Sequence, residues 1–361
     1  MVLIDKPPHQ QLPGRRSGAG LRGIKKKTIV AIFLGCCAAI VGVKIKNSMP
    51  VAPVSDKTIE SKKDITTSSQ VPNSLLASSL MRTSGEGWEI VDWTDDIKGS
   101  NFTCHWANFT STSGESIEFC THPFRDIVSG SIRRSGQWGD CNILPQLWKD
   151  ATKLQNSIYL EIGANIGACL FEMLLSTDAK IIAFEPHPMN QFNLRSTMSR
   201  LNPEYQNRVV LVPVGLGEAQ AKSVIHSAYN NLGNSNIGVF VEDYGNQAAP
   251  DVFKFDVAVE RLDTILDPAH IHIPLVKMDA QGFECKIMEG MGSEIADTIK
   301  EVKFEYAHKW LMAQNCTDLL ERFRAFDFDL YRKGNLITSK TVAFKMTEMN
   351  AKKKQKAIAS S

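Results

Sequence analysis

The residues best suited to chemistry begin with the glycine-containing run Tyr159–Gly167, which reads YLEIGANIG. Gly163 and Gly167 directly follow a short apolar segment, and glycines there let the backbone turn sharply and approach a ligand closely. A dinucleotide-binding turn has the order G-x-G-x-x-G, but Asn165 takes the place of its second glycine here. The run therefore fits a nucleoside without a pyrophosphate better than it fits a dinucleotide.

Acidic side chains follow at the ends of further apolar segments. Glu185 ends the second segment, where a carboxylate can accept hydrogen bonds from both ribose hydroxyls of a nucleoside. The same residue could instead cap the helix that Pro188 opens. Asp279 ends the fourth buried segment, and Glu305 and His308 follow the fifth. Because ligands of open α/β sheets bind beyond the carboxyl ends of the strands, we expect these side chains beside the nucleoside.

These side chains could serve a reaction at a hydroxyl group, which is a poor nucleophile until a base removes its proton. Asp279 is the first candidate for that base, Glu305 the second and His308 the third. Asp279 and Glu305 could alternatively hold a divalent cation that orients the hydroxyl. Glu284, in the first turn of the next helix, could equally serve the helix dipole or function. No metal site is predicted, because His308 has no second ligand at helical spacing.

Alternating strand and helix signals position these residues. Lys180–Phe184, which reads KIIAF, is typical of a parallel strand buried on both faces. Residues 227–250 are rich in Asn and Gly and predict a long loop. The repeated βα units predict an α/β fold with a doubly wound parallel sheet, and a C-terminal hairpin predicts one antiparallel strand at its edge. Strands are expected over 158–162, 180–184, 209–214, 256–260, 275–278, 302–305, 328–331 and 341–345, and helices over 166–175, 188–200, 283–291 and 317–326.

Four sequence blocks resemble the FkbM-type methyltransferases. They read LEIGANIG, IIAFEPHPMN, VERLDTIL and VKMDAQGFECKIMEGM, and they follow the family's order between Ser157 and Phe344. Cys120–Asp140 also resembles a segment that precedes the domain in membrane-linked eukaryotic members. The resemblance implies a Rossmann-like class I methyltransferase with a mostly parallel seven-stranded sheet, which uses S-adenosylmethionine and acts on oxygen.

The resemblance also implies a set of cofactor contacts. Many members have Asp at the position of Glu161, and the Glu keeps the charge but lengthens the side chain. The implied cofactor-binding residues are Glu161, Gly163, Asn165, Gly167 and Glu185.

The strongest apolar run in the chain, Thr28–Val43, carries no charge and lies between basic clusters. We predict a transmembrane signal anchor over 28–45, and a cleaved signal peptide is the alternative. More positive charge precedes the run than follows it, so residues 1–27 would be a basic cytosolic tail. The protein would then be a single-pass type II membrane protein of the endoplasmic reticulum or Golgi, with its catalytic domain in the lumen.

The rest of the chain divides by composition. Residues 46–84 are rich in Ser, Thr, Lys and Pro and predict a flexible stalk. Aromatic residues then return in a short N-terminal cap over 85–150. The methyltransferase domain is expected over 151–347, and the lysine-rich residues 348–361 predict a disordered basic tail.

Cysteines and glycosylation sequons agree with an oxidising lumen. Cys169 and Cys285 fall on expected core helices, where buried free thiols are predicted. Disulfides are predicted among the even set that remains outside the apolar run, Cys104, Cys120, Cys141 and Cys316, and a zinc site built from some of them is the weaker alternative. N-glycosylation sequons begin at Asn101, Asn108 and Asn315.

The net charge of +2 gives no reason to expect a nucleic acid partner. The preferred function is O-methylation of a hydroxyl on a glycan or another small or polymeric acceptor, bound by 227–250 and by Arg133, Arg134 and Trp138 of the cap. A nicotinamide-dependent oxidoreductase would share the fold but would not explain Asn165 or the Asp279 block. An inactive nucleoside-binding module on a membrane stalk is the third possibility.

Overall fold

The computed structural model describes residues 74–82, 88–93, 101–228, 231–241, 251–339 and 346–354. All of them belong to one compact unit, Thr66–Ser361. The predicted cytosolic tail, the signal anchor over 28–45 and most of the predicted stalk lie outside the described residues. Among the helices that are described, none is long and apolar enough to cross a membrane.

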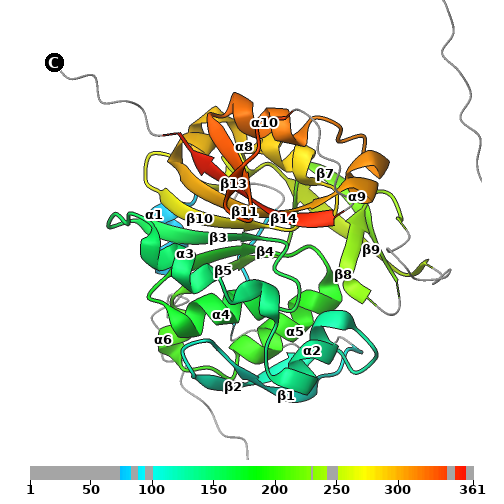
Figure 1. The fold of residues 1–361 in the computed structure, drawn as a ribbon. Coiled ribbons are helices and arrows are strands. Elements are labelled where there is room, and N and C mark those ends of the chain that lie inside the picture. The colour runs from blue at the N-terminus through cyan, green and yellow to red at the C-terminus, as the bar shows by residue number, and fades with distance from the viewer. Residues whose placement is uncertain are drawn as a thin grey trace, which may run out of the picture. The chain divides into compact units, whose positions relative to one another are not determined.

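A central sheet runs through the unit in the order β13-β12-β14-β11-β10-β3-β4-β5 (Figure 1). The five strands from β11 to β5 are parallel, and β14 pairs antiparallel with both β11 and β12. The strands are β3 (Ser157–Ile162), β4 (Lys180–Phe184), β5 (Val209–Val212), β10 (His272–Met278), β11 (Ile299–Ala307), β12 (Phe328–Arg332), β13 (Asn335–Leu336) and β14 (Met346–Lys353).

The strands formed by the C-terminal part of the chain differ from those predicted. It has eight strands within the described residues, of which the two-residue β13 exceeds the expected seven. The antiparallel strand β14 lies between β11 and β12 and not at an edge, and the predicted strand 341–345 lies outside the described residues. Residues 348–353 are therefore a strand and not a disordered tail. Met349 and Ala351 are fully buried and alternate with polar residues, so the lysines that suggested a tail belong to a half-buried strand.

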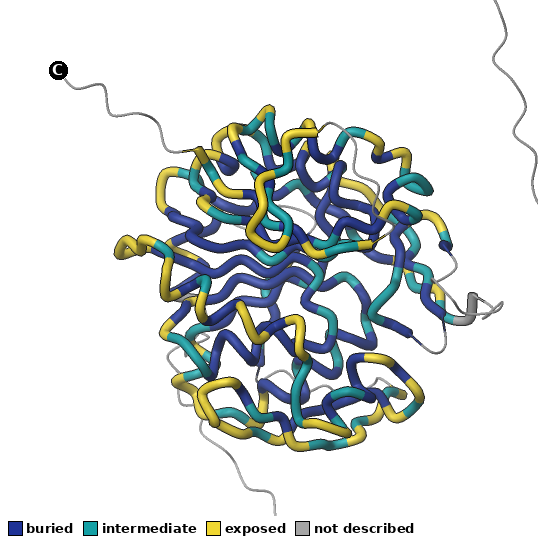
Figure 2. Tube along the Cα trace, viewed as in Figure 1, coloured by how far each residue is buried: buried dark blue, intermediate teal, exposed yellow. Residues whose placement is uncertain are grey.

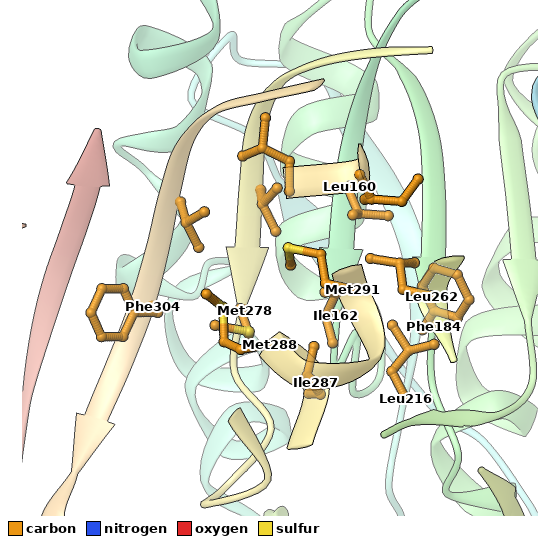
Figure 3. Packing of buried hydrophobic residues seen from close by; sticks show 14 of the residues in the cluster. Leu160, Ile162, Phe184, Leu216, Leu262, Met278, Ile287, Met288, Met291 and Phe304 are labelled. Atoms are coloured by element: carbon orange, nitrogen blue, oxygen red, sulfur yellow. The ribbon is translucent and has the colours of Figure 1, made fainter. Parts of the chain in front are cut away.

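Helices cover both faces of the sheet and bury two separate apolar clusters. The helices α4 (Ala168–Ser176) and α5 (Pro188–Met198) follow β3 and β4, and α8 (Glu284–Thr298) and α10 (Leu319–Ala325) belong to the other cluster. Figure 3 shows α8 packing through Ile287, Met288 and Met291 onto Ile162 and Met278 of the sheet. The central strands are buried along most of their length (Figure 2), so the carboxyl edge of the sheet is fixed in place. Short helices complete the layers at α6 (Pro203–Gln206), α7 (Leu262–Ile265) and α9 (His308–Ala313).

A second, four-stranded sheet includes residues 227–228 and 231–237 of the predicted loop over 227–250. Its order is β6-β9-β7-β8, with β6 (Gly215–Leu216), β7 (Ala221–Ala228), β8 (Asn231–Ile237) and β9 (Asp251–Glu260). The Asn-rich β8 is a strand because its backbone pairs with β7 and its side chains bond to the loops around it. Residues 242–250 of the predicted loop lie outside the described residues.

The N-terminal cap packs on the α4–α5 side of the sheet. It contains the hairpin β1 (His105–Thr110) and β2 (Ser116–Thr121), then α2 (Ile127–Ser135), the 3-10 helix η1 (Gly139–Cys141) and α3 (Leu144–Asp150). The folded part begins earlier than predicted, because α1 (Ser74–Leu80) lies within the expected stalk and buries Leu76 and Leu80 in the core.

Three disulfides occur in the described part of the chain: Cys104–Cys120, Cys141–Cys169 and Cys285–Cys316. The prediction that Cys169 and Cys285 are free thiols was wrong. Both are buried in the core as expected, but each lies in the first turn of its helix, where a cysteine of another segment reaches it.

Candidate active site

A cavity of about 380 Å³ opens at the carboxyl ends of β3, β4, β10 and β11. It is lined by most of the predicted site residues and by side chains from the cap and from β8. Gly167 and His308 are not among the lining residues, and His308 is exposed at the start of α9. The predicted residues that line it are Glu161, Gly163, Asn165, Glu185, Asp279 and Glu305.

The two glycines are required by packing between protein segments. Gly163 has φ 78°, and a Cβ there would lie 2.0 Å from the carbonyl oxygen of Asp279, so the loops after β3 and β10 can touch only with glycine. Gly167 has φ 92°, and its Cβ would lie 2.8 Å from the ring of Phe171. Gly163 thus lets the β3 loop approach Asp279, whereas Gly167 lets the start of α4 pack on Phe171 and Leu194 and does not line the cavity.

Glu185 has protein partners on both carboxylate oxygens. Its Oε2 accepts a hydrogen bond of 2.6 Å from the backbone N–H of Asn165, and its Oε1 accepts one of 2.9 Å from the backbone N–H of His187. Asn190 Nδ2 donates a third at 3.3 Å. The helix α5 is capped by His187, whose Nδ1 accepts from the N–H of Met189, so Glu185 is not its side-chain cap. Burial raises the pKa of Glu185, and these donors oppose the shift.

Glu161 is equally buried but lacks such partners. Neither carboxylate oxygen has a hydrogen-bond partner among the described residues. Burial raises its pKa to about 7, although Lys277 on the neighbouring strand lowers it. A buried carboxylate without a donor is costly, so this position favours a ligand group that can supply one.

A row of charged residues crosses the sheet beneath the cavity. Register pairs Glu161 with Lys277 and Lys277 with Lys303 on adjacent parallel strands, so the three side chains share one face. Lys303 bonds to Glu348 of β14. Burial lowers the pKa of Lys277, but the nearby carboxylates, chiefly Asp279 and Glu161, outweigh it and raise the pKa overall.

Gln281 bridges Asp279 and Glu305, and the sequence did not predict it as a site residue. Gln281 Nε2 donates to Asp279 Oδ1, and to Glu305 Oε2 at 3.1 Å. Lys277 Nζ lies 3.4 Å from Asp279 Oδ2. Burial, together with the charges of Asp279 and Glu348, raises the pKa of Glu305 to about 9, so Glu305 is protonated at neutral pH.

Several site residues carried no signal in the sequence. Lys277, Lys303 and Glu348 resemble ordinary strand residues, and only the register across three strands brings them to the cavity. Gln281 has φ 53°, and Asn236 Nδ2 donates to its carbonyl at 2.8 Å, which fixes the turn that aims its side chain. The sequence block around Asp279 predicted that a turn follows β10, but it did not predict the hydrogen bonds of Gln281 within that turn.

Glu284 has a structural role. Its Oε1 accepts from the backbone N–H of Ala280 at 3.0 Å, and burial raises its pKa to about 7. It supports the loop after β10 and does not line the cavity. Across the described residues, no three His, Cys, Asp or Glu side chains are placed to hold a metal ion.

The cap contributes a wall to the cavity. Ile127 and Val128 of α2 line it, as do Trp138 and Asp140. Arg133, predicted to contact an acceptor, instead donates to Thr121 Oγ1 and to the carbonyls of His122 and Phe124 and lies outside the lining. Arg134 is also outside it.

Residues 161–330 match the family model of the methyltransferase FkbM domain. No curated protein matches the chain.

Three similar solved structures are methyltransferases of low identity. Precorrin-6y C5,15-methyltransferase from Geobacter metallireducens GS-15 is 11% identical, over 59% of this chain and 87% of that chain, with a TM-score of 0.30. An S-adenosylmethionine-dependent O-methyltransferase from Thermotoga maritima is 10% identical, over 69% and 78%, with a TM-score of 0.32. The glycopeptide N-methyltransferase MtfA complexed with S-adenosylmethionine is 9% identical, over 60% and 87%, with a TM-score of 0.28.

Proposed function

We propose that the chain, whose residues 161–330 form an FkbM methyltransferase domain with S-adenosylmethionine as its cofactor, methylates a hydroxyl oxygen of its acceptor. The observation that carries the proposal is the pair of carboxyl groups on Asp279 and Glu305, which Gln281 bridges in the cavity wall. The Asp279 side chain is 33% exposed, so a bound acceptor can reach it. A hydroxyl needs a nearby base, and this is the part of the cavity that offers one.

The other end of the cavity fits the cofactor. S-adenosylmethionine supplies a methyl group on a positively charged sulfur and carries ribose hydroxyls and an amino group as donors. Glu185 lines the cavity, and its Oε2 accepts one protein hydrogen bond, from Asn165, so this oxygen has a second lone pair for a ribose hydroxyl, whereas Oε1 already accepts from His187 and Asn190. The unpartnered oxygens of Glu161 suit a cationic donor. We therefore assign cofactor binding to Glu161, Asn165 and Glu185, with Gly163 and Gly167 shaping the loop.

Asp279 is the base in this proposal. Lys277 places a positive charge 3.4 Å from its Oδ2, and Gln281 orients its Oδ1. Glu305, with its pKa raised to about 9, carries its own proton at neutral pH and acts as a hydrogen-bond donor. His308 lies outside the cavity lining and has no part in proton transfer.

The acceptor carries no negative charge. Asp140, Asp279, Glu305 and Glu348 all line the cavity, while its two lysines are paired with carboxylates of the same set. A site that keeps Glu305 protonated also disfavours a phosphate, sulfate or carboxylate on the ligand. An uncharged hydroxyl acceptor, such as a neutral glycan, fits this wall, and the partly exposed Trp138 can stack on a sugar face.

We further propose that the domain lies in the lumen of the secretory pathway, held by the apolar run Thr28–Val43. Three disulfides support an oxidising compartment. The asparagines of the three sequons, Asn101, Asn108 and Asn315, are exposed, as glycosylation requires.

Ligand binding and methyl transfer test the function together. S-adenosylhomocysteine at 100 times its dissociation constant should stabilise the purified domain by roughly 2.7 kcal/mol, while NAD should leave thermal unfolding unchanged. Labelled S-adenosylmethionine should then transfer its methyl group to neutral glycans and not to sulfated or uronic-acid glycans. If NAD stabilises the domain and S-adenosylhomocysteine does not, the protein is better explained as an oxidoreductase than as a methyltransferase.

Topology is tested separately in sealed microsomes. Glycosidase treatment of the membrane-expressed protein should increase its mobility, through Asn101 or Asn108 at least. The domain should resist added protease until detergent is present. Complete digestion without detergent would place the domain on the cytosolic side.

A further inference from the structure

One disulfide of the described chain borders the cavity. Cys169 lines it, and Cys141 directly follows Asp140, which also lines it. No cysteine of the pairs Cys104–Cys120 and Cys285–Cys316 is among the lining residues. Of the three disulfides, Cys141–Cys169 therefore lies at the cavity wall and the other two lie away from it, although all three close short loops.

The bond joins two segments that shape the cofactor end of the cavity. Cys141 belongs to η1, and Trp138 and Asp140 of the same segment form the wall on the cap side. Cys169 is the second residue of α4, which begins immediately after the loop from Gly163 to Gly167. Both sulfur-bearing residues are almost fully buried. The disulfide thus sets the distance between the cap wall and the cofactor loop.

The wall segment is tied to the cap just before Trp138, where the Thr110 N–H donates to the Gly136 carbonyl at 2.8 Å and Ser131 Oγ donates to the Gln137 carbonyl at 3.0 Å. The backbone hydrogen bonds of η1 are local, from Cys141 N–H to the Trp138 carbonyl at 3.1 Å and from Asn142 N–H to the Gly139 carbonyl at 3.2 Å. No side chain caps η1. Among the described residues no hydrogen bond joins the segment from Trp138 to Asn142 to α4, so the disulfide is its direct link to that helix.

The remainder of the cap is attached independently of this bond. Glu172 of α4 accepts from the backbone N–H of Thr112 at 3.0 Å, and Trp148 Nε1 donates to Asp178 at 2.9 Å. Asn193 of α5 donates to the carbonyl of Cys120 at 3.1 Å. Loss of Cys141–Cys169 should therefore free the wall while the cap stays docked.

We propose that the Cys141–Cys169 disulfide is a positioning element of the cofactor site, which holds the Trp138–Asp140 wall against the β3 loop. The cap then completes the S-adenosylmethionine site itself, in addition to any part in acceptor binding. Full cofactor affinity consequently requires the oxidised protein. The inference depends on the cofactor and not on the chemistry of the acceptor.

The test compares three double variants of the purified domain by calorimetry with S-adenosylhomocysteine. Removing the bond by Cys141→Ala with Cys169→Ala should weaken binding about tenfold, or ~1.4 kcal/mol, because the wall must be ordered on binding. The closest control is Cys285→Ala with Cys316→Ala, since its cysteines are 31 residues apart against 28 for Cys141 and Cys169. A second control is Cys104→Ala with Cys120→Ala. Both controls should lower the melting temperature by a comparable amount but change affinity less than twofold.

Trp138→Ala in the disulfide-bonded protein separates positioning from general stability. It should weaken S-adenosylhomocysteine binding on its own, and adding it to the Cys141/Cys169 variant should cause little further loss, since both changes act on one wall. Equal loss of affinity in all three disulfide variants would overturn the proposal. If the Cys141/Cys169 variant does not fold, unchanged affinity in Trp138→Ala would overturn it as well. If the wild-type protein binds no S-adenosylhomocysteine, the assignment of S-adenosylmethionine as the cofactor is refuted instead.

Discussion

The two ends of the cavity hold their carboxyl groups by different kinds of partner. At the end of β4, backbone N–H groups of Asn165 and His187 fix Glu185. At the ends of β10 and β11, Asp279 and Glu305 are held by side chains, chiefly the amide of Gln281. Backbone donors cannot leave unless a loop moves, whereas side-chain donors can change partners within a fixed backbone.

In our proposal this difference separates cofactor binding from proton transfer. A rigid acceptor such as Glu185 is preorganised, so little entropy is lost when a ligand binds. A base must take up a proton and therefore benefits from partners that can rearrange, as Lys277 and Gln281 can around Asp279. Substitutions of Glu185 should consequently change the affinity for the cofactor, whereas substitutions of Asp279 should change the rate of methyl transfer.

The largest effect is expected from Asp279→Asn. The amide keeps the shape but cannot accept the acceptor proton, so the rate of methyl transfer should fall roughly 10²–10⁴-fold. The affinity for S-adenosylhomocysteine should change little, because the cofactor end is intact. Single-turnover kinetics and calorimetry on the same preparation measure both quantities.

The matched control for Asp279→Asn is Asp329→Asn, on β12 and outside the cavity lining. It makes the same chemical change in the same sheet and should leave the rate unaltered. Near-normal turnover by Asp279→Asn would make Asp279 a structural residue and overturn its assignment as the base. If Asp279 and Glu305 instead hold a divalent cation, a chelator should lower the rate of the wild-type enzyme, which distinguishes this role from base catalysis.

A smaller effect on a different quantity is expected from Glu185→Ala. It leaves the backbone donors of Asn165 and His187 without their acceptor, at a cost of about 1–3 kcal/mol in stability. It also removes the oxygens assigned to the ribose, so S-adenosylhomocysteine should bind more weakly. Unchanged affinity by calorimetry would disprove the ribose contact, even if the protein were less stable.

The sequence predicted the residues at the β3 and β4 end of the cavity more completely than those at the β10 and β11 end. Gly163, Asn165 and Glu185 lie within 23 consecutive positions of one βαβ unit, and local spacing was enough to place them. Asp279 and Glu305 were also predicted, because each ends an apolar strand. Their contacts with Gln281 and Lys277 were not predicted. Glu348, which lies opposite Glu305, was also missed, because it belongs to a strand whose lysines suggested a disordered tail.

Pairings between distant segments were the least predictable feature. Cys285 and Cys316 are separated by 31 residues, and only the packing of α8 against the segment before α10 brings them together. Strand β8 was mistaken for a loop because Asn and Gly disfavour strands, whereas its pairing with β7 decides its structure. Tertiary contacts of this kind override local propensity.

The most specific effect should come from Glu305→Gln and is measured as the pH dependence of stability. Burial raises the folded-state pKa of Glu305 from 4.5 to about 9, so between these values the folded protein holds a proton that the unfolded chain releases. The stability contributed by Glu305 is thus fully present below about pH 4.5 and is lost as the pH rises towards 9. Gln cannot ionise but can still accept from Gln281, so the variant should match the wild type near pH 4.5 and become the more stable protein at pH 8.5. Urea unfolding at pH 5, 7 and 8.5 measures the difference, and Glu301→Gln on the same strand, outside the cavity lining, is the control. A difference that is the same at all three pH values would mean that Glu305 is already ionised, and the catalytic end would then hold a fixed charge like the cofactor end.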